Sequence, residues 1–383
     1  MNVLSVFDNL IDQEHVISVL REAVSASSDI SNQSQEMTHA WLFTGPPGSG
    51  RSNAALAFAA ALVCKLGGCN DCIDCKTALT GTHADVELVK TEGLSIKIDE
   101  VRSLITRASW SPAVGNYRVV VIEDADRLTE SAANALLKAI EEPGLRTVWL
   151  LCAPSATDVL PTIRSRTRSL VLRTPSVAAV AALLEEEKFS AAMANFAARA
   201  SQGHIGRARH LAKSEDARTR RQAILKISLL ITDVASAFKA AQVLVEAAKA
   251  EAEEEAEKRD DAELSSLKEA WGQQGSKLTQ GGAKVVKDLE KEQKSRTTRM
   301  VRDYLDRALL DIATLYRDIL LIQANSLDSI INTDLITEIT KISNSTTPEA
   351  TLAKLEAIMN ARTNLSHNAA PLLTIEALMV SLK

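Results

Sequence analysis

The first half of the chain alternates between two hydrophobic patterns. Short apolar runs rich in β-branched residues predict buried parallel strands, and apolar residues at intervals of three or four predict helices between them. The expected strands are 41–44, 85–90, 117–122 and 147–152, and the expected helices are 53–65, 98–108 and one that follows Thr129 or Ser131 and stops at Pro143. This alternation indicates an α/β fold in which a parallel sheet carries helices on both faces.

The flanking segments are of a different kind. Residues 25–36 are Ser-rich and polar without periodicity, which predicts a linker before the first strand. From Pro175 onward the apolar residues keep helical spacing alone, and the expected helices are 177–187, 191–201, 205–213, 312–324 and 350–359. We therefore expect an α/β domain over 1–174, a small helical domain over 175–215 and an all-α domain over 216–383.

The last of these domains contains an interval of segregated charge. Residues 246–263 carry nine acidic side chains against three basic ones, whereas residues 284–302 carry seven basic against three acidic. Because opposite charges on facing helices attract, these two segments, joined by the glycine-bearing 271–282, predict an antiparallel hairpin over about 246–302. Two interpretations stay open, a solvated surface insertion and an arm that binds a partner.

Composition excludes several classes of protein. The formal net charge of −5 argues against a general nucleic-acid-binding surface, and an aromatic content of 3% argues against stacking of bases on aromatic platforms. No apolar run approaches the ~20 residues that a membrane helix needs, and the first residues lack the basic and apolar regions of a signal peptide. We expect a cytoplasmic protein without membrane contact.

Four of the five cysteines lie close together in the sequence. Cys64, Cys69, Cys72 and Cys75 follow the pattern C-x4-C-x2-C-x2-C. Four thiolates at this spacing offer a closed tetrahedral site for one Zn²⁺, and a closed site has no position for a reacting water. We therefore expect a structural zinc module. Cys152 lies in an apolar run and is expected to be a small buried hydrophobe.

The segment between the first strand and its helix reads GPPGSGRS, the spacing of a P-loop with Arg51 in place of lysine. Its glycines, Gly45, Gly48 and Gly50, would let backbone N–H groups surround phosphates at a helix N-terminus. Ser52 would hold Mg²⁺. A guanidinium is planar and bulky and does not replace the slender lysine between the β- and γ-phosphates. A P-loop that binds ATP and Mg²⁺ and one that binds nucleotide poorly or not at all are both open.

Charged residues also follow two of the expected strands. Glu123 and Asp124 come after the 117–122 strand, where α/β sheets bind ligands and where a nucleotide hydrolase positions Mg²⁺ and water. Arg164 and Arg166 follow the 147–152 strand and its loop. An arginine near a phosphate stabilises the charge that develops in phosphoryl transfer, and the alternative for both arginines is a structural contact with a helix C-terminus.

Together these segments resemble the AAA+ clamp-loader family of bacterial replication. Residues 7–24 are similar to the family's box ahead of the P-loop, and the P-loop, the cysteine module, the acidic strand end with SAANALLKAIEEP and the segment LPTIRSRT follow in family order. The resemblance covers about residues 1–215. It implies an AAA+ P-loop domain with a zinc module, a helical lid and a helical collar that holds a ring of subunits. It implies gamma/tau and delta subunits as partners, with the sliding clamp and primed DNA met through the complex.

Departures from the family pattern bear on the role of this subunit. A gamma/tau motor is expected to have lysine in the P-loop, Asp-Glu at the strand end and an arginine in the sensor 2 helix. This chain has Arg51, the pair Glu123-Asp124 and Gly206 at those places. The resemblance therefore implies a component of the polymerase holoenzyme with little or no ATPase of its own. It assigns Arg166, in an SRC motif with threonine for cysteine, as an arginine finger that reaches the ATP site of the adjacent gamma/tau subunit.

Three other features depart from the family pattern: Asp12 stands where its first box has glycine, the first cysteine gap is short, and the charged hairpin has no counterpart. Two alternative functions stay open. The chain could itself be a gamma/tau-like motor that hydrolyses ATP, or an AAA+-like interaction protein outside replication that uses the hairpin as its docking arm.

Overall fold

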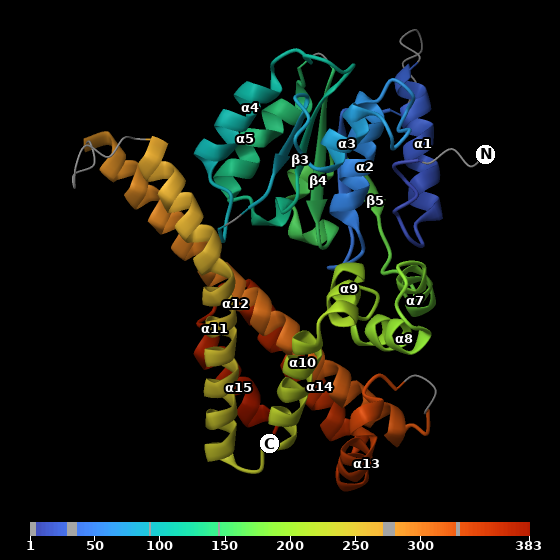
Figure 1. The fold of residues 1–383 in the computed structure, drawn as a ribbon, viewed down its shortest axis with the longest axis vertical. Coiled ribbons are helices and arrows are strands. Elements are labelled where there is room, and N and C mark those ends of the chain that lie inside the picture. The colour runs from blue at the N-terminus through green and yellow to red at the C-terminus, as the bar shows by residue number, and fades with distance from the viewer. Residues whose placement is uncertain (1–4, 29–36, 92, 145, 271–279, 327–329) are drawn as a thin grey trace. The chain divides into compact units, whose positions relative to one another are not determined.

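The structure is a computed structural model that describes residues 5–28, 37–91, 93–144, 146–270, 280–326 and 330–383. The chain divides into two compact units, Met1–Ala212 and Lys213–Lys383. The first unit contains every strand that the structure describes, and the second is helical (Figure 1).

A five-stranded parallel sheet in the order β2-β3-β4-β1-β5 forms the centre of the first unit. Its strands are β1 Ala40–Thr44, β2 Val86–Val89, β3 Arg118–Ile122, β4 Thr147–Ala153 and β5 Arg168–Val171. The α/β fold predicted from the sequence is confirmed, and four of these strands lie where the apolar runs placed them. The fifth was not predicted, because this short edge strand buries only Leu170 among its four residues.

The two faces of the sheet support separate cores (Figure 1). Side chains alternate along each strand, so Val119 and Val121 of β3 join the core on one face, and Val120 and Ile122 join the core on the other. The first face is covered by α1 Glu14–Ser28, α2 Arg51–Val63 and α3 Ile73–Leu79, and the second by α4 Ile98–Ala108 and α5 Glu130–Glu141. Small alanines dominate the buried residues of α2, which lets this helix approach the strands closely.

Helix α1 corrects one prediction, because it continues through Ser28 where the sequence predicted a linker from residue 25. The hydroxyl of Ser25 donates to the carbonyl of Arg21 at 3.0 Å, and that of Ser27 donates to Val24 at 2.7 Å. These bonds satisfy the serines inside the helix, which polar composition alone does not reveal. The rest of the predicted linker, 29–36, lies outside the described residues.

The first unit ends with α6 Pro161–Arg164, α7 Val177–Glu186, α8 Ala191–Ala200 and α9 Ile205–Lys213. The side chains of Ser176 and Ser190 cap α7 and α8. Asp12, which replaces a glycine of the family pattern, has a left-handed φ of 55°. Its carboxylate accepts the N–H of Ser176 at 2.7 Å, and this hydrogen bond lowers the pKa of Asp12. Asp12 therefore ties the N-terminal segment to the start of α7.

The second unit packs six helices around one apolar core. They are α10 Glu215–Leu229, α11 Val234–Ala270, α12 Gln280–Gln323, α13 Ile336–Ser345, α14 Pro348–Ser366 and α15 Pro371–Ser381. The predicted start of the helix at 312–324 is wrong, because these residues form the C-terminal part of the continuous helix α12. None of the described helices is long and apolar enough to cross a membrane.

Most of the acidic residues lie in the C-terminal half of α11 and most of the basic residues in the N-terminal half of α12. These two helices pack against each other. Ala248, Ala252 and Ala256 are buried on α11 at intervals of four residues. Arg296 of α12 is 6% exposed and pairs with Glu263 of α11, its NH1 lying 2.9 Å from Oε1. The two helices thus pair through small apolar side chains as well as charge, and most of the expected turn, 271–279, lies outside the described residues.

A buried polar network fixes Ile331 and Asn332, which lie ahead of α13. The guanidinium of Arg221 donates to Asp311 at 2.8 Å and to Asn332 at 2.6 Å. Asp318, which is fully buried, accepts the backbone N–H groups of Ile331 and Asn332. Every one of these charged groups has a partner, as buried charges require.

Candidate functional site

The predicted P-loop connects β1 to α2, as the motif requires. Gly48 and Gly50 have left-handed φ values of 89° and 85°, and a Cβ atom at Gly45 would lie only 2.5 Å from Oγ of Ser49. The glycines are therefore needed for this turn. Gly50 begins α2, since its carbonyl accepts the N–H of Ala54 at 2.8 Å. The loop has the backbone form of a phosphate cradle at a helix N-terminus.

Arg51, the residue that replaces lysine, is turned back onto this loop. Its NH1 donates to the carbonyl oxygen of Gly45 at 3.0 Å. Within the described part of the chain, Nε of Arg51 and Oγ of Ser49 are buried without a hydrogen-bond partner. A guanidinium bound to a loop carbonyl is not aimed at the place where a lysine would meet the β- and γ-phosphates.

His204, which the sequence did not single out, covers the loop from the side of α9. A Cβ atom at Gly48 would lie 2.5 Å from Cγ of His204 and 2.7 Å from its Cα. The ring Nδ1 accepts the N–H of Arg207 at 3.3 Å. The only signal in the sequence was the segment GHIGRAR, in which Gly206 stands where the family has an arginine. His204 thus reaches the P-loop from a helix more than 150 positions away, which no local pattern shows.

The predicted acidic strand end follows β3, and the positive charge of Arg51 in the P-loop acts on its carboxyl groups. Burial raises the pKa of Glu123, against the effect of Lys90, whose Nζ lies 3.5 Å from Oε1 of Glu123. Burial also raises the pKa of Asp126, and the positive charge of Arg51 lowers it in part. The structure therefore brings Arg51 and these carboxyl groups within electrostatic reach of one another.

Arg166, the predicted arginine finger, lies just after α6. Its Nε donates to Oε1 of Glu141 at 2.5 Å, and its NH1 donates to the carbonyl of Thr162 at 3.0 Å and to Oγ of Ser165 at 3.2 Å. None of these partners belongs to the P-loop of the same chain. The side chain of Arg166 is 41% exposed.

The four cysteines predicted to bind metal come together at the end of α2 and the start of α3. Their sulfur atoms all lie within 4.8 Å of one another, and the Sγ of Cys64 is 3.8 Å from that of Cys69 and 3.7 Å from that of Cys72. Zn–S bonds of about 2.3 Å in a tetrahedron place sulfur atoms roughly 3.8 Å apart. The cluster therefore fits a four-coordinate Zn²⁺, which when bound would crosslink the module.

Backbone N–H groups donate to two of the cysteines, and at Cys72 burial outweighs them and raises the pKa. The N–H of Leu66 donates to Cys64 at 3.3 Å, and that of Cys75 donates to Cys72 at 3.4 Å. Burial opposes ionisation of Cys64, but the surrounding N–H donors outweigh it and lower its pKa to about 7. Burial raises the pKa of Cys75. Cys152 is fully buried, as predicted, and its burial raises its pKa.

Asp85 anchors the loop before β3, a role that the sequence did not predict. The side chain is fully buried, and its carboxylate accepts the backbone N–H groups of Ala113, Val114 and Gly115 at 2.6, 2.7 and 2.7 Å. Burial would raise the pKa of Asp85, but these three donors outweigh it and hold the pKa below 3.8. The anchor lies on the amino-terminal side of β2 and β3.

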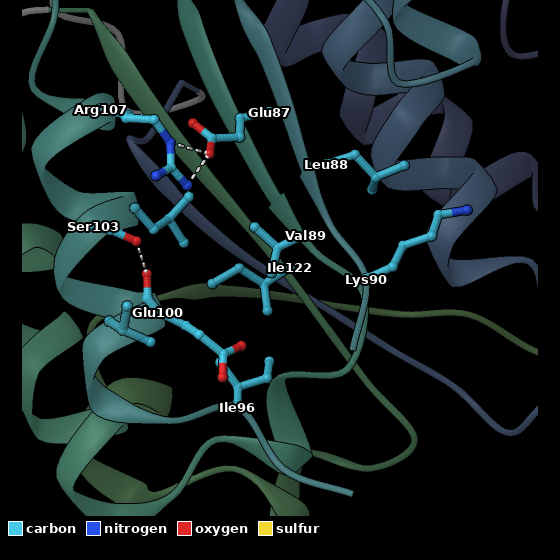
Figure 2. A pocket seen from close by; sticks show the side chains of 11 residues that line it. Glu87, Leu88, Val89, Lys90, Ile96, Glu100, Ser103, Arg107 and Ile122 are labelled. Carbon is cyan, nitrogen blue, oxygen red and sulfur yellow. Dashed lines mark hydrogen bonds and ion pairs between the residues drawn. The ribbon is translucent and has the colours of Figure 1, made fainter. Parts of the chain in front are cut away.

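A cavity of about 290 Å³ lies along β2 and α4 (Figure 2). Its wall contains the ion pair between Glu87 and Arg107, whose Nε to Oε1 distance is 2.7 Å. Lys90 lines the cavity as well, but its ammonium group pairs with Glu123. Three of the charged side chains on the wall thus have an ion-pair partner, and none of the predicted site residues lines this cavity.

The match to a family model lies within the first unit. A family model described as DNA polymerase III, delta subunit, matches residues 21–176. DNA polymerase III subunit delta' of Bacillus subtilis is 32% identical over 200 residues, which are 51% of this chain and 60% of the relative. Subunit delta' of Pseudomonas aeruginosa is 37% identical over 147 residues, 37% of this chain and 45% of the relative. Subunit gamma/tau of Mycobacterium bovis is 32% identical over 172 residues, 44% of this chain and 28% of the relative. The matches thus span between 28% and 60% of these relatives' lengths.

Proposed function

The chain belongs to the AAA+ clamp-loader family of DNA polymerase III subunits, and from this premise we propose that it acts as the delta prime subunit of a bacterial clamp loader. In this role it helps to load the sliding clamp onto primed DNA, while gamma/tau subunits hydrolyse the ATP. The chain contributes a place in the ring, beside gamma/tau and delta subunits, and an arginine finger in trans.

The arrangement of the P-loop is the observation that carries the proposal. Arg51 donates to the carbonyl of Gly45 at 3.0 Å, and His204 lies against Gly48. A bound triphosphate needs the inward-facing N–H groups of the loop and a cation between its β- and γ-phosphates. Gly206 stands where the family pattern has the sensor arginine, with Arg207 one position away. These features support a subunit that does not power the loader.

Arg166 is the residue that would act on another subunit's nucleotide. Its side chain is 41% exposed, and its partners within the chain are Glu141, Thr162 and Ser165. An exposed, oriented guanidinium can stabilise the charge on a transferring phosphoryl group that a neighbour binds. Residues 1–174 would form the AAA+ domain, 175–215 its lid and 216–383 the collar, with a structural zinc ion in the cysteine module.

The test of the finger is Arg166→Ala in a loader reconstituted with its gamma/tau and delta subunits. We expect turnover of ATP to fall by a factor on the order of 10³, as for other arginine fingers. Arg164→Ala is the matched control, because Arg164 is a neighbouring exposed arginine whose NH1 donates to the carbonyl of Ala156 at 3.4 Å. Equal turnover in the wild-type and Arg166→Ala loaders would refute the role.

A gamma/tau-like motor is the second candidate, favoured by the intact glycine geometry of the P-loop and by the gamma/tau relative. Titration of the isolated chain with ATP and Mg²⁺ separates the two. The delta prime proposal expects weak or absent binding and no hydrolysis. Micromolar binding together with multiple turnovers would establish the motor instead.

A further inference from the structure

We propose that Glu141 is a positioning residue for Arg166, and that it holds the guanidinium in the orientation from which this side chain reaches a neighbour's phosphate. The inference rests on the proposed role of Arg166 as a finger in trans. Glu141 is the last residue of α5, and Arg166 follows α6, which packs against α5.

The contacts of Arg166 within the chain involve two of its three guanidinium nitrogens. Nε is held by the carboxylate of Glu141 at 2.5 Å, and NH1 is held by the carbonyl of Thr162 and the hydroxyl of Ser165. NH2 makes no hydrogen bond or ion pair with any residue that the structure describes. A planar guanidinium held at two of its nitrogens is fixed in orientation, so its remaining N–H groups point in a defined direction, which suits a phosphate oxygen.

The position of Glu141 argues against a role in stabilising its own helix. A helix C-terminus carries partial negative charge, so a glutamate in the last turn is unfavourable there and a cation is favourable. Glu141 adds a carboxylate at this negative end, so the carboxylate and the helix C-terminus both attract the guanidinium of Arg166. This attraction explains why the side chain of Arg166 lies against α5.

The exposure of the pair also points to orientation rather than stability. The side chains of Arg166 and Glu141 are 41% and 47% exposed, and an ion pair this open to water contributes little to folding. Orientation of the guanidinium matters more for catalysis. A free arginine side chain has many rotamers, and fixing it in the reactive one costs conformational entropy. Removal of the Glu141 carboxylate should therefore lower the rate of the chemical step without changing how the neighbouring subunit binds ATP.

The matched pair of variants is Glu141→Ala and Glu142→Gln in the reconstituted loader. Glu142 is the adjacent exposed glutamate, and the structure gives it no ion pair. We expect Glu141→Ala to lower kcat about tenfold with an unchanged KM for ATP. Glu141→Gln, which keeps an acceptor oxygen, should lose less, and Glu142→Gln should lose nothing.

A double-mutant cycle with Arg166→Ala separates positioning from a merely structural effect. If Glu141 acts through the finger, Glu141→Ala has no further effect once Arg166 is gone. The same tenfold loss in the Arg166→Ala loader would overturn the inference, and so would an unchanged or raised kcat for Glu141→Ala alone. A raised kcat would mean that Glu141 holds the finger back. Normal turnover of Arg166→Ala is a separate result, which would refute the proposed role of Arg166 as a finger.

Discussion

The hydrogen bonds that Asp85 accepts give a quantitative prediction, because a single substitution removes all of them. Asp85→Ala removes a buried carboxylate that accepts three backbone N–H groups at 2.6–2.7 Å. Hydrogen bonds to a charged group contribute about 1.5 kcal/mol each, so three amount to about 4.5 kcal/mol. In a unit of about 200 residues each kcal/mol shifts the melting temperature by roughly 2–4 °C, which gives a decrease of about 9–18 °C.

The pH dependence of the wild type provides an independent check on the same carboxylate. The pKa of Asp85 is lowered in the folded chain, so its contribution is fully present above 3.8 and is lost as the pH falls through the folded value. The Asp85→Ala chain lacks this contribution at every pH. The difference in stability between the two proteins should therefore shrink on acidification below about pH 4.

Calorimetry measures the global effect, and hydrogen exchange of the 110–117 segment measures the local one. We expect the amides of 113–115 to lose protection in Asp85→Ala, because their acceptor is gone. Asp99→Asn is the control, since Asp99 is 88% exposed on α4 and should leave melting unchanged. A melting temperature of Asp85→Ala within about 2 °C of the wild type would refute the reasoning.

Two further predictions concern the metal and the second unit, beside those for Arg166 and for ATP binding given above. Metal analysis under reducing conditions should find about one Zn²⁺ per chain, lost in Cys75→Ser and retained in Cys152→Ala; clearly less than one in the wild type would contradict the zinc module. Arg221→Ala should cost about 3–5 kcal/mol in denaturant unfolding, because it removes a buried guanidinium that pairs with Asp311 and donates to Asn332. Arg220→Ala, which breaks an exposed pair with Glu251, should cost far less, and equal losses would show that burial of the Arg221 network does not matter.

The sequence by itself determined the features that depend on neighbours along the chain. Helix Ile98–Ala108 was predicted with its observed bounds, because its apolar residues recur at helical spacing on one buried face. The spacing of the glycines sufficed to predict a P-loop between a strand and a helix, and the spacing of the four cysteines sufficed to predict one cluster. Each of these is a local pattern with a local physical cause.

The tertiary structure alone decided which distant groups meet. Three contacts join residues that are at least 25 positions apart: His204 with Gly48, Asp85 with the 113–115 loop, and Glu141 with Arg166. The direction of Arg51 was also hidden, since a side chain at a helix start can point to a ligand or back to its own loop. These contacts depend on how the sheet orders its strands and helices, and hydrophobic periodicity does not encode that order residue by residue.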